Sequence, residues 1–180
     1  MLEVNGMEVP TSLDDLLDPR RVALIVYDMQ VGITRQIGDR ERVLRQVGAV
    51  LGSARQAKVR TLFTRHMLLP RGLMGSMQYR TAMACQHTDD PTHVKSPFLR
   101  DSPGFAIVPE LQPRDSEAVF DKITMPAFEG TPLAIALRDC GVRVVVTVGI
   151  ALEIGIEPTA RHAAGGERSL RFPLFVGAVG

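Results

Sequence analysis

The hydrophobic pattern of the chain predicts strands that are buried on both faces. Three short apolar runs, at residues 22–28, 59–65 and 142–150, show no regular alternation of apolar and polar positions. Runs of this kind are typical of strands that are covered on both sides of a sheet. A fourth strand is expected at residues 118–123.

Helix-like segments separate these strands. Residues 40–57 place apolar side chains at helical spacing, residues 131–141 have a proline near their start and a glycine at their stop, and a further helix is expected at 153–164. Strands that alternate with helices are joined by right-handed crossovers, which give a mostly parallel sheet. The pattern therefore predicts the α/β class, with one doubly wound, three-layer α/β/α domain over residues 1–180.

Two segments break this rhythm. Residues 66–117 are rich in proline and form a connection far longer than compact domains use, so we expect a lid-like or partner-binding excursion with a short helix near residues 76–85. Residues 169–180 look like a last strand, but Pro173 would interrupt a central ladder. No closing helix follows this strand, so the C-terminus is expected to be atypically short.

Composition excludes several classes of protein. Of the 180 residues, 45% are hydrophobic and 23% are charged, which suits a packed core. The formal net charge of +1 argues against a dedicated nucleic-acid or membrane-surface binder. No apolar run approaches the roughly 20 residues of a membrane span, and the N-terminus lacks a signal-peptide core. We therefore expect a cytoplasmic protein.

Candidate chemistry gathers at one predicted edge of the sheet. In open parallel sheets, sites form at the carboxyl ends of the strands. Asp28 ends the first strand, Lys122 ends the fourth, and the last strand runs into a helix start at Gly155. Each residue alone has an ordinary structural explanation, as a turn, a solvated cation or a packing glycine, so only their combination indicates a site.

Three motifs carry a family resemblance. They are YDMQ at 27–30, KITMPAFEGTPL at 122–133 and VVVTVGIALEIGIEPTARHA at 144–163. Together they resemble the isochorismatase-like, or cysteine hydrolase, superfamily, in the same order and over most of the chain. The matching positions beyond Asp28 and Lys122 are Phe128, Gly130, Thr131, Gly149, Ile156, Thr159, Ala160 and Ala163.

The resemblance implies a catalytic set that lacks its usual nucleophile. The family triad is aspartate, lysine and cysteine; Asp28 and Lys122 match, but the cysteine position falls on Gly155. Thioester chemistry has nothing to start it without the thiolate. The isochorismatases proper share this replacement and hydrolyse a vinyl ether, which needs no protein nucleophile. The resemblance also implies a non-proline cis peptide at Ile150–Ala151.

The implied mechanism assigns a role to each residue. Asp28 would protonate the terminal carbon of the enol ether, and Lys122 would orient Asp28 and hold a substrate anion or hydroxyl group. A nearby ammonium lowers the pKa of a carboxyl group, so the source of the proton stays open. Gly155 would leave room for substrate or water, and backbone N–H groups at the helix start would favour negative charge.

Further residues are expected to bind substrate. A dicarboxylate such as isochorismate suits the planar fork of arginine, and Arg65 ends the second strand on the proposed rim. Gln78, Phe128, Ile150 and Ala151 are predicted to line the pocket. We expect no metal and no other cofactor.

The four histidines and two cysteines have mainly structural interpretations. No histidine pair has a convincing metal-ligand spacing, so solvated side chains are expected at His66, His87, His93 and His162. Cys140 precedes the last predicted strand and is expected to be buried and structural. Cys85 lies in the excursion, which could fold over and bring its thiol to the site.

Two other functions stay open. The chain could be a catalytically silent family member that serves as a binding or assembly subunit, or an amide hydrolase that uses activated water or Cys85. The retention of both Asp28 and Lys122 favours an enzyme over the silent alternative. A missing terminal helix would expose apolar surface, and oligomers are common in the family, so we expect a homo-oligomer, a dimer or larger.

Overall fold

The computed structural model describes residues 1–96, 98–166 and 172–175. Its centre is a five-stranded sheet in the order β5-β4-β3-β6-β7, in which every pair of neighbours is parallel. The order reverses between β3 and β6, as in doubly wound folds. The strands are β3 (Val22–Tyr27), β4 (Arg60–His66), β5 (Ala118–Lys122), β6 (Val144–Gly149) and β7 (Phe172–Phe175).

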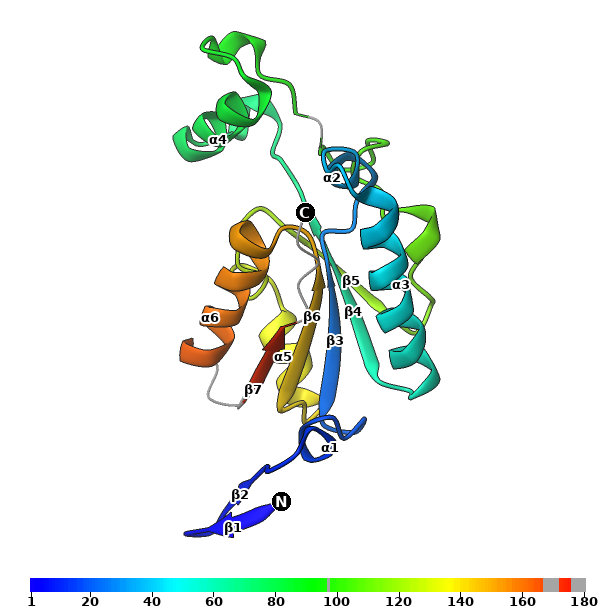
Figure 1. Ribbon diagram of the computed structural model, residues 1–180. Helices are drawn as coiled ribbons and strands as arrows, with labels where there is room; N and C mark the ends of the chain where they lie inside the picture. The colour runs from blue at the N-terminus through cyan, green and yellow to red at the C-terminus, as the bar shows by residue number, and fades with distance from the viewer. Residues whose placement is uncertain (97, 167–171, 176–180) are drawn as a thin grey trace.

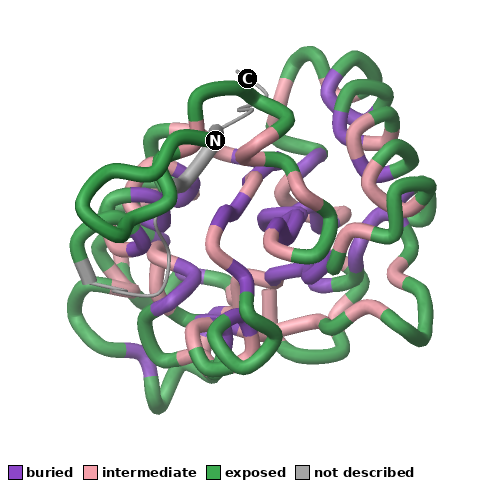
Figure 2. The backbone as a smooth tube through the Cα atoms, turned by 90° about the horizontal axis from the view of Figure 1, so that it is seen from below, coloured by how far each residue is buried: buried purple, intermediate pink, exposed green. Residues whose placement is uncertain are grey.

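Helices cover both faces of this sheet and make the three predicted layers. Helix α3 (Arg40–Gln56) lies on one face, and α5 (Leu133–Asp139) and α6 (Glu157–Gly166) lie on the other (Figure 1). Buried residues of the strands face two apolar clusters, one against α3 and one against α5 and α6. The buried positions concentrate on the central segments, and the outer loops are exposed (Figure 2). The predicted fold class is confirmed.

The second half of the long excursion belongs to the core. Helix α4 (Ser76–Gln86), with the short helices η1 (Arg71–Leu73) and η2 (Pro91–His93), stands beyond the carboxyl ends of the strands (Figure 1). The chain then returns, and Ile107, Val108 and Leu111, the last of them in η3 (Pro109–Leu111), pack in the cluster against α3. Only the first half of residues 66–117 therefore has the position of a lid.

Four small elements that the periodicity did not predict lie before and directly after β3. Strands β1 (Leu2–Val4) and β2 (Met7–Val9) form an antiparallel hairpin, followed by α1 (Leu13–Leu16), and α2 (Val31–Thr34) follows β3. The hairpin projects from the end of the sheet opposite α4 (Figure 1). Its turn residues Asn5 and Gly6 have φ of 53° and 75°. An Asn-Gly pair between short apolar runs is a strong hairpin signal that could have predicted these strands.

Strand β7 is at the edge of the sheet, where proline is tolerated. Pro173 is the register partner of Val145 in β6, and an edge strand needs no donor on its outer side. The rest of the predicted strand at 169–180 lies outside the described residues. Across the parts of the chain that are described, no helix combines the length and apolarity needed to cross a membrane.

Candidate active site

Asp28 directly follows β3 and forms the centre of the candidate site. Its φ of 49° lies in the left-handed region, which short polar residues enter more readily than most. Its N–H donates to the carbonyl oxygen of Thr64 at 3.2 Å, and the Thr64 hydroxyl donates to Oδ1 of Asp28 at 2.7 Å. Asp28 is only 4% exposed. The neighbouring strand therefore fixes one oxygen of a buried carboxylate.

Lys122, the last residue of β5, binds the other oxygen. Its Nζ lies 2.7 Å from Oδ2 of Asp28 and 3.2 Å from the carbonyl oxygen of Thr124, and the ammonium sits 4.3 Å from the centre of the Tyr27 ring. Burial lowers the pKa of Lys122, whereas the attraction of Asp28 opposes that shift. The two groups form a buried ion pair in which a proton can be shared between nitrogen and carboxylate.

The strand register gathers the site on the α5–α6 face of the sheet. Thr64 is the register partner of Tyr27, and His66 is the register partner of Lys122. Partners in a sheet point to the same face, and so do residues two apart on one strand. Because Tyr27 packs in the cluster with residues of α5, all four side chains lie on that face.

His66 is a site residue that sequence reasoning placed in solvent. It ends β4 beside the ion pair, and its Nδ1 is buried with no hydrogen-bond partner among the described residues. Burial lowers the pKa of His66, the Lys122 ammonium adds to this effect, and the Asp28 carboxylate opposes it. A neutral imidazole with a free ring nitrogen can accept or deliver a proton at this position. The signal was its place at a strand end next to Arg65.

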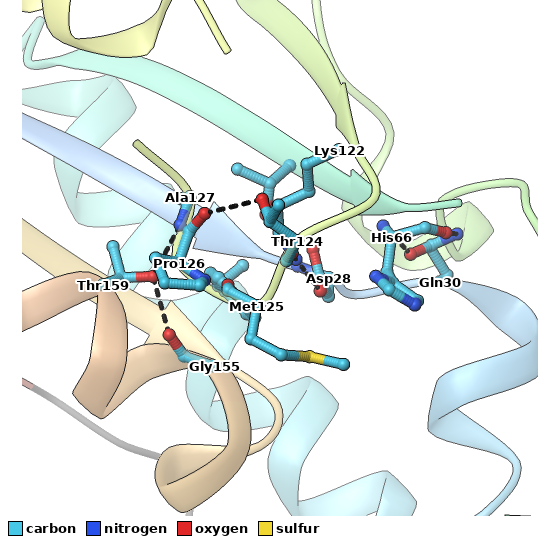
Figure 3. Close-up of polar contacts among 12 residues, drawn as sticks. Asp28, Gln30, His66, Lys122, Thr124, Met125, Pro126, Ala127, Gly155 and Thr159 are labelled. Atoms are coloured by element: carbon cyan, nitrogen blue, oxygen red, sulfur yellow. Dashed lines mark hydrogen bonds and ion pairs between the residues drawn. The ribbon is translucent and has the colours of Figure 1, made fainter. Parts of the chain in front are cut away.

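Gln30 holds the backbone of His66 in place. Its Nε2 donates to the carbonyl oxygens of His66 and Phe105, both at 3.0 Å, and its Oε1 accepts from the His66 N–H at 2.6 Å. Gln30 is completely buried. Gln30 lies beside His66 (Figure 3), and its amide joins the end of β4 to the returning excursion at Phe105. This gives a structural role to the last residue of the YDMQ motif.

The loop after β5 is joined by hydrogen bonds to helix α6. The hydroxyl of Thr159 in α6 accepts from the Ala127 N–H at 2.9 Å and donates to the Gly155 carbonyl oxygen at 2.6 Å. Lys122 holds the near end of the same loop through Thr124 (Figure 3). The hydrogen bonds position the loop across the site.

Gly155 lies in a single π-helical turn, η4 (Leu152–Ile156), between β6 and α6. A β-carbon built on Gly155 would lie 2.1 Å from the hydroxyl oxygen of Tyr27. The expectation that Gly155 leaves room for substrate or water is therefore wrong, because the Tyr27 phenol already fills that space. The predicted cis peptide at Ile150–Ala151 is present.

Arg65 lies at the carboxyl end of β4, as predicted, but its side chain points away from the ion pair. It precedes His66 on β4, so strand alternation turns its side chain to the α3 face. Its Nε donates to Oδ1 of Asp121 at 2.7 Å, and its guanidinium lies 4.2 Å from the centre of the Phe105 ring. The ion pair and the opposite face leave the predicted substrate role without support.

The other predicted pocket residues are dispersed. Phe128 is a core residue that stacks on His162 at 5.8 Å, and Ile150 packs in the α3-side core with Ala151 against it. Gln78 is on α4, beyond the ends of the strands (Figure 1). The structure brings together Asp28 and Lys122 of the predicted set and adds residues that were not predicted.

Neither cysteine is near the ion pair. Cys140 is exposed at the end of α5, which corrects the expectation of a buried thiol. Cys85 is exposed on α4, the helix that stands apart from the sheet (Figure 1). Within the described part of the chain, no group of three or more His, Cys, Asp or Glu side chains could hold a metal ion.

The family model of the isochorismatase domain matches residues 22–166 of this chain. The chain belongs to the isochorismatase family. This match spans every strand from β3 to β6 and the residues of the candidate site. Among relatives of the family, the chain is 29% identical over 147 residues to the uncharacterized isochorismatase family protein YwoC of Bacillus subtilis, covering 82% of this chain and 72% of that protein.

Other members carry named activities. Ureidoacrylate amidohydrolase RutB of Acinetobacter baylyi is 25% identical over 160 residues, covering 81% of this chain and 65% of RutB. The chain thus spans just under two thirds of that relative. An isochorismatase family protein from Desulfovibrio vulgaris shares the fold with a TM-score of 0.72 at 21% identity, over 88% of this chain and 83% of its own. N-carbamoylsarcosine amidase from Thermoplasma acidophilum shares the fold with a TM-score of 0.65 at 20% identity, over 87% of this chain and 81% of the amidase.

Proposed function

We propose that this isochorismatase-family chain is a hydrolase that acts without a covalent protein nucleophile and cleaves an enol ether such as isochorismate. The observation that carries the proposal is the buried Asp28–Lys122 pair, together with a glycine at position 155, where the Tyr27 ring that contacts Lys122 fills the space of a side chain. A buried pair of this kind costs desolvation energy and is weak evidence for stability, so its chemistry is the better reason for it.

The reaction needs one acid and one water molecule. Protonation of the terminal vinyl carbon gives an oxocarbenium ion, water adds to the adjacent carbon, and the resulting hemiketal collapses to pyruvate and a dihydrodiol. The proton comes from the Asp28–Lys122 pair. At rest, both oxygens of Asp28 accept hydrogen bonds, which stabilises the carboxylate and leaves the proton on Lys122.

The lowered pKa of Lys122 makes this proton easier to pass on. Lys122 gives it to Asp28, which delivers it to carbon, and the carboxylate that remains stabilises the positive charge of the oxocarbenium ion. The water that adds returns one proton to the pair, so the pair is regenerated. In this proposal, neutral His66 relays that proton: it accepts the proton from the attacking water and passes it to the pair.

Substrate must displace a covering segment to reach the pair, because Asp28 and Lys122 are 4% and 3% exposed. The loop after β5 is that segment in this proposal. It lies next to the ammonium, and its Met125 carbonyl oxygen accepts a hydrogen bond from Tyr27. Loops that open to admit a substrate and close to complete the catalytic site are common in enzymes.

The test measures pyruvate release from isochorismate by the wild type, Asp28→Asn and Lys122→Met. Removing a general acid costs about 10²–10⁴-fold in rate, and we expect losses of that order in both variants. Lys95→Met is the matched control, since Lys95 is exposed and its side chain is not part of the site. Circular dichroism checks that each variant is folded. Folded wild type that releases no pyruvate would remove this substrate.

Amide hydrolysis by activated water is the second candidate, because the named relatives include an amidohydrolase and an amidase. In this alternative, neutral His66 accepts the proton of the attacking water. Ammonia release from ureidoacrylate and N-carbamoylsarcosine tests it, with Cys85→Ser as a control that should keep full activity, because Cys85 is exposed on α4. A folded chain that turns over neither substrate class would favour a silent binding subunit.

A further inference from the structure

The phenol of Tyr27 occupies the space that a side chain at position 155 would enter. A β-carbon on Gly155 would lie 2.1 Å from the hydroxyl oxygen, 2.4 Å from Cζ and 2.5 Å from Cε1 of Tyr27. Non-bonded carbon contacts are favourable only near 3.5–4.0 Å, as a rough guide. Both the hydroxyl group and the ring edge are therefore too close for any side chain.

Tyr27 cannot simply swing aside. It is 1% exposed and packs in the core cluster on the α5–α6 face. Its hydroxyl group donates to the Met125 carbonyl oxygen, and its ring face contacts the Lys122 ammonium at 4.3 Å from the ring centre. Burial raises the pKa of the phenol, so it stays a neutral donor. The ring face and the hydroxyl group of Tyr27 therefore each have a fixed partner.

We propose that Tyr27 is the specificity-determining residue that excludes a covalent nucleophile from this site. In this interpretation, glycine at 155 is imposed by the tyrosine and not by a substrate. The reaction class that follows, hydrolysis without an acyl-enzyme, rests on the proposed function, whereas the steric exclusion is independent of it. Tyr27 also stabilises the charged form of Lys122 through its ring, so one side chain both closes the covalent route and supports the proton source.

The exclusion at position 155 comes from the Tyr27 side chain, whereas the backbone of strand β3 restricts a second position. Tyr27 is its last residue, and its carbonyl oxygen also lies 2.0 Å from where a β-carbon on Gly149 would be. The end of β3 thus approaches β6 and η4 so closely that glycine is required at two positions. A smaller residue at 27 would relieve the contact at 155 but not the one at 149, since only the former involves the side chain.

A double-mutant cycle in urea unfolding tests the steric claim. Gly155→Ala should clearly lower the urea midpoint of the wild type, and in the Tyr27→Val background the same change should leave the midpoint unchanged or raise it. Tyr27→Leu serves as a second background if the valine variant folds poorly. Gly165→Ala is the matched control on α6, because a β-carbon there meets nothing within 4 Å and should cost no stability. Equal losses from Gly155→Ala in both backgrounds would overturn the proposal.

A second arm tests the chemistry, in a chain with Cys85→Ser and Cys140→Ser. Gly155→Cys together with Tyr27→Val should react with p-nitrophenyl acetate in a burst of one p-nitrophenolate per chain. The introduced thiolate attacks the ester carbonyl, a thioester forms, the ester bond breaks and p-nitrophenolate leaves. Tyr27→Val alone should show no burst.

The outcomes separate this inference from the proposed function, because neither arm uses an enol ether. A burst in the double variant, with Gly155→Cys alone destabilised, supports exclusion by Tyr27 whether or not isochorismate is a substrate. A double variant that is folded but shows no burst would overturn the claim that Tyr27 is what bars the covalent route. So would Gly155→Cys alone with wild-type stability.

Discussion

At the scale of single residues, the carboxylate of Asp28 and the ammonium of Lys122 stabilise each other only as a pair. Both are buried, so removing either partner leaves a charge without compensation. Breaking a buried pair costs about 3–5 kcal/mol. We expect Lys122→Met to lower the free energy of unfolding by that amount, and the double variant Asp28→Asn with Lys122→Met to lose less than the sum of the two single changes. Urea denaturation measures all three.

His66 gives the fold a pH dependence of a defined sign. Its pKa is lowered from 6.5 in the folded chain, chiefly by burial, so the unfolded chain binds more protons below that pH. The contribution of neutral His66 to the free energy of unfolding is therefore fully present above about pH 6.5. It is lost as the pH drops toward the pKa of His66 in the folded chain. We expect the free energy of unfolding to decrease between pH 7.5 and 5.5 more steeply in the wild type than in His66→Gln. Parallel curves would show that His66 titrates alike in both states.

The contrast between Arg65 and His66 shows what the sequence leaves undetermined at this scale. Both stand at the end of a predicted strand, and a shift of one position changes the face to which a side chain points. In a strand buried on both faces, Leu62 and Phe63 are equally apolar, so the pattern does not reveal which face is which. Asp28 and Lys122 were predictable because motifs mark them. The contact of Tyr27 with Gly155 was not, because it joins residues 128 positions apart.

At the scale of elements, the hydroxyl group of Thr159 connects α6 to the loop after β5. It is buried, and it satisfies the Ala127 N–H and the Gly155 carbonyl oxygen at once. Thr159→Val keeps the shape of the side chain but removes the hydroxyl group, which leaves both backbone partners unsatisfied. We therefore expect the free energy of unfolding to fall by about 1–3 kcal/mol. Thr159→Ser, which keeps the hydroxyl group, should lose less. Thermal or urea unfolding distinguishes the two, and equal losses would assign the effect to packing.

The same connection predicts an effect on the site. If Thr159 positions the loop that covers Asp28 and Lys122, Thr159→Val should change the turnover of any substrate more than Thr131→Val does. Thr131 is a suitable comparison, because it lies at the end of the loop nearer to α5. Its hydroxyl donates to the Ala127 carbonyl oxygen at 2.6 Å. Steady-state kinetics of the folded variants compare them. Equal effects on kcat would mean that the loop is held by its whole length and not by its contact with α6.

The elements themselves differ in how far the sequence determined them. The three apolar runs predicted β3, β4 and β6 within one or two residues, since burial on both faces demands such runs, and the fourth expected strand, at 118–123, matches β5 within one residue. The helices α3 and α6 followed from their spacing. The path of residues 105–111 back into the core could not be predicted, because single apolar residues among prolines show no periodicity. The Asn5–Gly6 turn was readable but rests on strands of only three residues.

At the scale of the whole molecule, stability is expected to fall from the central strands to the two projecting segments. Every residue of β3 is buried, and the strand is paired on both sides. The hairpin β1–β2 has all six residues exposed, and its Leu2, Val4, Met7 and Val9 are apolar. A two-stranded hairpin without a covering layer is marginally stable. Helix α4 also stands apart from the sheet, with Ala82 as its buried residue.

Native-state hydrogen exchange measures this gradient directly. Amides of β3 should exchange only by global unfolding, whereas those of β1, β2 and α4 should exchange by local opening, orders of magnitude faster. The expectation depends on the chain alone covering its own surfaces. If the hairpin amides were instead protected like those of β3, and lost that protection on dilution, a second copy would have to cover the apolar face of the hairpin, because mass action makes such protection depend on protein concentration. The exchange rates therefore also test the predicted homo-oligomer.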